Sequence, residues 1–175
     1  MWPSRGAAVA LLACGACGYR FSAAGGPLPK GVQSVDVPVL RNRTTEAGFE
    51  AWLAEDLRSE LERDGHGGGR GSDARLDGVI ETVGGMPLAL KAAPPLVGAT
   101  GMIPYNPGLY QISATVTMQL WRGGELLAQL DHVTQTDSYL PADDLATNEA
   151  NRRLALRRLS RALAKEIVDR LVSAP

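Results

Sequence analysis

The chain has 175 residues and a formal net charge of −1, with 18 basic and 19 acidic side chains. This balance excludes the strongly basic surface that nucleic-acid-binding domains carry, so no nucleic acid is expected among the partners. The length suits a single domain with one hydrophobic core, and two cysteines in all, Cys14 and Cys17, supply no disulfide framework for it.

The first residues have the features of a bacterial lipoprotein signal. Arg5 precedes an apolar run, residues 7–13, which is far shorter than the roughly 20 residues that a membrane-spanning helix needs. A lipoprotein signal ends in a cysteine that is acylated and becomes the new N-terminus. Leu11-Leu12-Ala13-Cys14 is the better local match to this lipobox, whereas Cys17 gives a leader of more usual length. We therefore expect lipidation at Cys14 or Cys17, after a signal peptide of residues 1–13 or 1–16.

The residue after either cysteine is a glycine, Gly15 or Gly18. Aspartate at this position favours retention in the inner membrane, so its absence predicts a lipid anchor in the outer membrane, on the periplasmic face. An anchor with more than one acyl chain is held stably. Residues 17–31 are rich in glycine and proline after the cysteine, which predicts a lipidated N-terminus followed by a flexible tether.

The domain is expected to begin with a strand and a helix. Residues 32–40 alternate, with Val35, Val37 and Val39 on one face, which predicts a strand. Pro38 indicates that this strand lies at a sheet edge or ends near this residue. A helix should follow, capped by Thr44 or Thr45 and running to about Asp64. Its buried stripe repeats every four residues: Phe49, Leu53, Leu57 and Leu61.

A second strand is predicted over residues 75–83, followed by a long insertion over residues 84–108. The insertion contains five prolines among many apolar residues. An irregular segment of this length in a compact domain is usually functional or disordered, and the apolar content argues against a solvated linker. We expect it to contact a partner; the alternative is that it folds back over an open sheet edge.

The remaining elements are a strand hairpin and a helix. Residues 110–121 alternate apolar and polar side chains without a break, Gly123 and Gly124 form a tight turn, and a strand follows to about Tyr139. Asp144 or Thr147 caps the last helix. That helix has a buried leucine stripe and a basic outer surface, which is either solvated or binds anionic head groups or phosphates. The candidate phosphate contacts are Arg152, Arg153, Arg157 and Arg161.

The element order β-α-β-β-β-α predicts an α/β (α+β) fold. Two helices packed on one face of a four-stranded, mostly antiparallel sheet would bury both apolar stripes and the apolar face of residues 110–120. The expected architecture is a two-layer sandwich, formed by a single domain over residues 32–175.

No catalytic, metal or cofactor site is predicted. The sequence has no nucleophile elbow and no zinc-binding motif, and its histidines are His66, in a glycine-rich loop, and His132. His132 follows Asp131 within a predicted strand, so the two side chains should point to opposite faces and form no dyad. An enzyme is therefore not expected.

The chain resembles the LptE family of lipopolysaccharide-assembly lipoproteins, from the tether to the last helix. The matching residues are Cys17-Gly18-Tyr19-Arg20-Phe21, Leu28-Pro29, Val35-Asp36-Val37-Pro38-Val39, Asn42-Arg43-Thr44, Leu53 and Glu60-Leu61, followed by the hairpin and helix in the same order. The family's lipid-bearing cysteine precedes Gly-Tyr, which corresponds to Cys17.

The resemblance implies a plug inside the large outer-membrane β-barrel LptD, which delivers lipopolysaccharide to the outer leaflet. The implied partners are this barrel and lipopolysaccharide. Candidate barrel contacts are the apolar residues of the insertion: Leu88, Leu90, Leu96, Met102 and Ile103. The alternative hypothesis is an auxiliary lipoprotein of an ABC-type lipid transport system or of a secretion pore.

Overall fold

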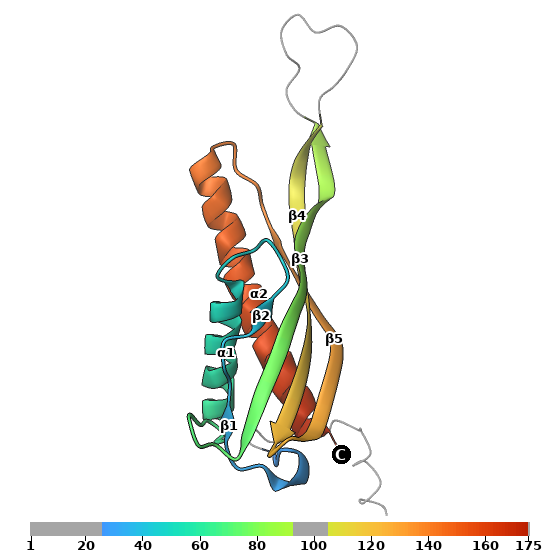
Figure 1. Cartoon of the computed structure of the whole chain (residues 1–175). Coiled ribbons are helices and arrows are strands. Elements are labelled where there is room, and N and C mark those ends of the chain that lie inside the picture. Colours follow the sequence, from blue (N-terminus) through green and yellow to red (C-terminus); the bar gives the residue numbers. More distant parts are fainter. Residues whose placement is uncertain (1–25, 93–104, 175) are drawn as a thin grey trace, which may run out of the picture.

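A computed structural model describes residues 26–92 and 105–174, without the side chains of residues 89–92 and 105–107. Both long helices lie on the same side of one sheet, so the predicted two-layer α+β architecture is confirmed (Figure 1). In chain order the elements are η1 (Pro29–Gly31), β1 (Val35–Asp36), β2 (Arg41–Asn42), α1 (Phe49–Arg63), β3 (Ala74–Ala92), β4 (Tyr105–Arg122), β5 (Glu125–Tyr139) and α2 (Leu145–Ser173).

The sheet has five strands and not four, because β1 lies within the predicted first strand, residues 32–40, and the unpredicted strand β2 follows it. β1 and β2 both pair in parallel with β3, whereas β3, β4 and β5 are antiparallel neighbours. Pro38 lies between the two short strands and has no N–H to donate to a ladder. The freed carbonyl of Val37 instead accepts from the Arg58 guanidinium, with Nη2 at 2.6 Å and Nε at 2.9 Å. Val39 is consequently 66% exposed, so its predicted place beside the buried Val35 and Val37 was wrong.

α1 begins later than predicted, at Phe49. Thr44 does not cap the helix, because it lies in the turn before it. In this turn the Thr44 hydroxyl accepts from Glu46 N, and Asn42 Oδ1 accepts from Thr44 N at 2.8 Å. The residue before the helix is Gly48, with a φ of 91° that favours glycine. The Glu50 carboxylate accepts from Gly48 N at 3.1 Å, which satisfies an N–H next to the helix start.

β3 and β4 continue well into the predicted insertion. Their ladder pairs Gly84 with Ser113 and still pairs Ala92 with Tyr105, so the irregular structure expected over residues 84–92 and 105–108 was wrong. Register shifts beside Pro87 show how the ladder tolerates the prolines. β5 ends opposite Tyr110, and beyond that point β3 and β4 form a two-stranded ribbon, residues 87–92 with 105–109 (Figure 1). The rest of the insertion, residues 93–104, lies outside the described residues.

The core lies between the helices and one face of the sheet. It buries the predicted face of β4 and the leucine stripes of both helices, as expected; the β4 residues are Ile112, Ala114, Val116, Met118 and Leu120. Asp144 caps α2, since its carboxylate accepts from Thr147 N at 2.8 Å. No described helix covers the other face of the sheet, which carries polar side chains such as Thr115, Thr117 and Gln119.

A bulge in β5 changes which face two residues occupy. Val133 pairs with Val116 and Leu130 pairs with Met118, so Asp131 and His132 lie opposite one β4 residue. His132 has a φ of 50°. Its Nδ1 lies 2.7 Å from Glu81 Oε2, and Asp131 accepts from the neighbouring Gln129 side chain. Both side chains therefore lie on the uncovered face, and the predicted opposite orientation was wrong because the bulge adds a residue.

Candidate functional site

The predicted basic face of α2 contacts α1 at three of its four candidate arginines. The Arg152 guanidinium forms a bidentate ion pair with Glu46 in the loop before α1. Arg153 and Arg157 lie over the ring of Trp52 on α1, with guanidinium-to-centroid distances of 6.0 and 5.1 Å. These contacts hold the two helices together, because arginine stacks on aromatic rings and pairs with carboxylates.

The electrostatics of Arg152 agree with this structural role. The hydrogen bonds that Arg152 donates to Glu46 raise the pKa of the Arg152 guanidinium, and Glu149 lies 3.6 Å away on the same helix. Arg157 is 3.9 Å from Glu55 on α1, and its side chain is three-quarters buried. Two of the four predicted phosphate contacts thus already face carboxylates.

Arg161 lies one turn further along α2 and differs from the other three. It is exposed and, unlike the exposed Arg153, does not stack on Trp52; it lines a groove of about 480 Å³ between the helices. Basic and acidic side chains alternate around this groove: Asp56, Glu60, Arg63 and Lys165 accompany Arg161. Of the four candidates, Arg161 has the guanidinium that is most available to a phosphate.

Large exposed apolar side chains gather toward one end of the molecule. Of the five predicted barrel contacts, Leu88 is exposed on β3. Leu90 lies in the ribbon, but its side chain is not described. The other three, Leu96, Met102 and Ile103, lie outside the described residues. We call the exposed set the distal apolar residues: Met86, Leu88, Leu140, Leu145 and Leu154. They come from β3, from the β5–α2 connection and from the first turns of α2, all of which lie toward the ribbon end (Figure 1).

The described chain starts at the opposite end. Gly26 lies against Val172, near the C-terminus of α2, where η1 also lies. Cys14 and Cys17 lie outside the described residues, but the chain that carries them joins the domain at this end. The attachment of the predicted lipid anchor and the distal apolar residues are therefore at opposite ends of the long axis.

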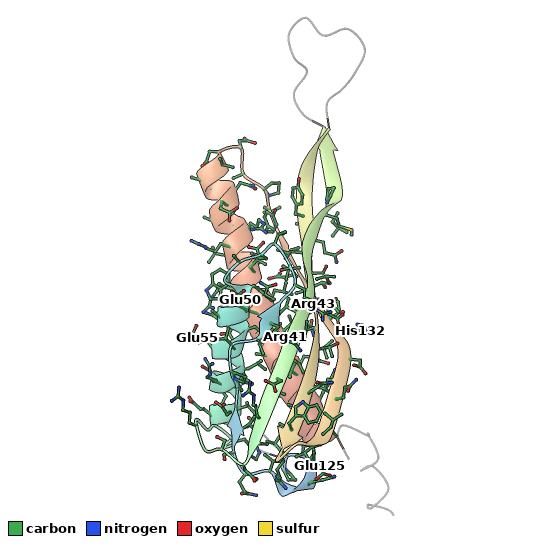
Figure 2. The ribbon with its side chains drawn as sticks, in the orientation of Figure 1. Arg41, Arg43, Glu50, Glu55, Glu125 and His132 are labelled. Carbon is green, nitrogen blue, oxygen red and sulfur yellow. The ribbon has the colours of Figure 1, made fainter. Side chains whose placement is uncertain are left out.

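A polar groove on the uncovered sheet face was missed by sequence reasoning. Arg41 and Arg43 stand beside β3 there, with His132 across the sheet (Figure 2). Two adjoining hollows of about 240 and 400 Å³ share Arg41, Asp77 and Gln119. The spacing of Arg41 and Arg43 signalled a common face, because residues two apart in extended chain point the same way. The strand β2, which holds Arg41 and ends just before Arg43, was not predicted.

Within residues 26–92 and 105–174, no three acidic, histidine or cysteine side chains are arranged to hold a metal ion. In the same part of the chain, no helix combines the length and the apolar character needed to cross a bilayer.

The sequence model of the LptE family, described as lipopolysaccharide-assembly, matches residues 32–171. The chain belongs to the LptE family. This match covers the whole described domain except η1 and the last residues of α2, so the resemblance inferred from short motifs is confirmed. LptE is a family of non-enzymatic envelope lipoproteins that act in lipopolysaccharide assembly.

Comparison with solved structures finds matches to this LptE-family chain at low identity, and a shared fold is shown by the first. A lipoprotein from Caulobacter crescentus CB15 has a TM-score of 0.55 and 14% identity, over 81% of this chain and 89% of that chain. Rare lipoprotein B from Shewanella oneidensis has a TM-score of 0.45 and 14% identity, over 77% and 93%. The PelC dodecamer from Paraburkholderia phytofirmans gives a TM-score of 0.48 and 13% identity, over 86% and 95%. Among curated protein sequences, none matches the LptE-family chain.

Proposed function

We propose that this LptE-family protein is anchored through Cys14 or Cys17 to the periplasmic face of the outer membrane. There it forms the plug and assembly partner of an LptD-like β-barrel, and the pair inserts lipopolysaccharide into the outer leaflet. The observation that carries the proposal is the family match over residues 32–171.

The position of the distal apolar residues supports a protein partner. From Cys17 to Gly26 the chain can span at most about 30 Å, at roughly 3.3–3.6 Å per residue. β4 has 18 residues, and a strand of that length extends about 60 Å. The distal apolar residues are thus far from the leaflet that would hold the anchor when the domain stands upright. Exposed apolar side chains that gather at one end of a protein are often covered by a partner.

The two-stranded ribbon supports the same conclusion. A hairpin without a third strand or a packed helix is only marginally stable in water. Met86 and Leu88 are exposed on β3 as it enters this ribbon. A partner surface packed along the ribbon would bury these side chains and stabilise the strand pair.

Lipopolysaccharide contact by the basic face of α2 remains part of the proposal. Arg161 is the leading candidate because it lines the interhelical groove, and Arg153 is exposed as well. Arg152 and Arg157 would have to bind phosphate while still facing Glu46 and Glu55. Any loss of binding in variants of these two residues must therefore be compared with their loss of stability.

The plug hypothesis is tested by purifying affinity-tagged full-length protein from its own outer membrane in mild detergent. A stoichiometric large β-barrel is expected among the co-purifying proteins, identified by mass spectrometry. Met86→Asp with Leu88→Asp should reduce the barrel yield, whereas the matched exposed-face control Thr136→Asp should not. Recovery of inner-membrane transport subunits without a barrel would instead favour the auxiliary-lipoprotein hypothesis.

The anchor is tested separately with Cys14→Ser and Cys17→Ser. Only the variant that lacks the lipidated cysteine should leave the membrane fraction. Mass spectrometry of the wild-type N-terminal peptide should find acyl chains on that same cysteine. Retention of both single variants and of the double variant in the membrane would contradict lipid anchoring at this segment.

A further inference from the structure

The groove on the uncovered face of the sheet is framed by two arginines whose direction is fixed by the residue between them. Asn42 points to the helix side, where its Nδ2 donates to Glu46 O at 2.8 Å and to Glu50 Oε2 at 2.7 Å. β2 pairs with β3, with Arg41 opposite Val79. Since strand residues alternate in direction, Arg41 and Arg43 are both held on the uncovered face.

The acidic groups near the groove already have partners. Asp77 Oδ1 accepts from Arg75 Nε at 2.8 Å. Glu81 accepts from Thr117 Oγ1 at 2.7 Å and lies 2.7 Å from His132 Nδ1; the Thr117 hydrogen bond is the main cause that lowers the pKa of Glu81. Among the described residues, no carboxylate lies within 4.0 Å of the Arg41 or Arg43 guanidinium nitrogens.

The groove also offers neutral groups suited to a sugar. Gln119 lines both hollows and supplies an amide donor and acceptor, and Trp121 lines the larger one with an apolar ring face. The two hollows, of about 240 and 400 Å³, have together the size of a small-ligand site. Guanidinium groups bind phosphate with paired, charge-assisted hydrogen bonds, and a pair two residues apart spans about 7 Å along a strand.

We propose that this groove binds a phosphorylated carbohydrate, with Arg41 and Arg43 on the phosphates and Gln119 and Trp121 on the sugar. The inference rests on the proposed function, since lipopolysaccharide carries phosphorylated sugars. It adds a phosphate contact on the sheet face, on the opposite side of the molecule from the basic face of α2.

The test uses full-length protein in detergent and isothermal titration calorimetry. The probe is a bis-phosphorylated glucosamine disaccharide without acyl chains, and its dephosphorylated counterpart is the chemical control. Arg41→Gln with Arg43→Gln should weaken binding of the phosphorylated probe by on the order of tenfold or more, because two charge-assisted contacts are lost. Arg41→Lys with Arg43→Lys should restore only part of it, because lysine lacks the planar fork.

Two further variants localise the site. Arg70→Gln removes an exposed arginine from the glycine-rich loop and should leave binding unchanged. Arg161→Gln tests the interhelical groove directly: a loss of probe binding in this variant, with normal binding by the Arg41/Arg43 double variant, would overturn the proposal. Equal binding of the dephosphorylated probe would overturn the phosphate role.

These outcomes are distinguishable from failure of the proposed function. The titration needs neither a barrel nor a membrane, so a protein that co-purifies with no barrel can still bind the probe through Arg41 and Arg43. Conversely, a barrel partner can be recovered with the Arg41/Arg43 double variant even when the probe no longer binds. Thermal unfolding followed by circular dichroism confirms that each variant is folded, as expected for exposed side chains.

Discussion

Ser160 Oγ donates a hydrogen bond of 2.5 Å to Asp56 Oδ2 and so connects the middle of α2 to the middle of α1. Ser160 is fully buried, whereas Asp56 is partly exposed at the edge of the interhelical groove. Asp56 can therefore replace this hydrogen bond with one to water, whereas Ser160 cannot.

Asp56→Ala should destabilise the protein more than Ser160→Ala. Asp56→Ala leaves the buried Ser160 hydroxyl without its partner, at a cost of about 1–3 kcal/mol. In Ser160→Ala the Asp56 carboxylate can still bind water, so only the net contribution of a typical hydrogen bond, about 1 kcal/mol, is lost. Urea unfolding of both variants measures the difference. A smaller loss in Asp56→Ala would mean that the Ser160 hydroxyl turns to the helix carbonyl one turn earlier.

Gly78→Ala should lower the free energy of unfolding by about 1–3 kcal/mol through overpacking. A Cβ at Gly78 would lie 2.4 Å from Met118 Sδ and 3.2 Å from Leu40 Cδ2, both in the buried core. Gly84→Ala is the matched control on the same strand, because no atom lies within 4 Å of its added Cβ. Thermal unfolding of the two variants should differ; equal midpoints would show that Met118 moves aside without cost.

The Arg152–Glu46 ion pair should show coupling in a double-mutant cycle. The two side chains are only 31% and 20% exposed, so screening by water is incomplete. We expect Arg152→Ala and Glu46→Ala to be non-additive by on the order of 1 kcal/mol, as measured by urea unfolding. Arg161→Ala, on the same helix but exposed, should change stability by less than about 0.5 kcal/mol. Additive losses would mean that the pair contributes no net attraction.

Glu50 should make the start of α1 sensitive to acid. Hydrogen bonds from its own backbone N–H, from the Asn42 side chain and from Gly48 N hold the pKa of the Glu50 carboxyl below its ordinary value of 4.5. A lowered pKa in the folded state stabilises the protein above the unfolded value, and this contribution is lost as the pH falls through 4.5 toward the folded value.

The measurement for Glu50 is the melting temperature of wild type and Glu50→Gln between pH 3 and pH 7, roughly the range over which carboxylates titrate. The gap between the two proteins should be largest near neutral pH and should close in acid. Glu62→Gln, an exposed glutamate on the same helix, should show no such convergence. A difference in melting temperature that is constant with pH would mean that Glu50 contributes through the shape of its side chain and not through its charge.

Much of the fold followed from local periodicity. The alternation of residues 110–121 and the leucine stripes identified the buried face of β4 and of both helices, because burial forces period 2 on a strand and 3.6 on a helix. The leader gave the lipoprotein class, and short motifs gave the family. The proline- and glycine-rich residues 84–92 were misread because a ribbon outside the core needs no apolar alternation and tolerates Pro87 at a bulge.

The candidate site could not be predicted to the same degree. The sequence by itself determined the apolar stripe of α2 and the basic character of its remaining surface. Only the tertiary structure decided that Arg152 faces Glu46, that Arg157 stacks on Trp52, and that Arg41 and Arg43 share the uncovered face. The physical reason is that periodicity reports which face of an element is buried, whereas the partner across that face is set by how distant segments pack.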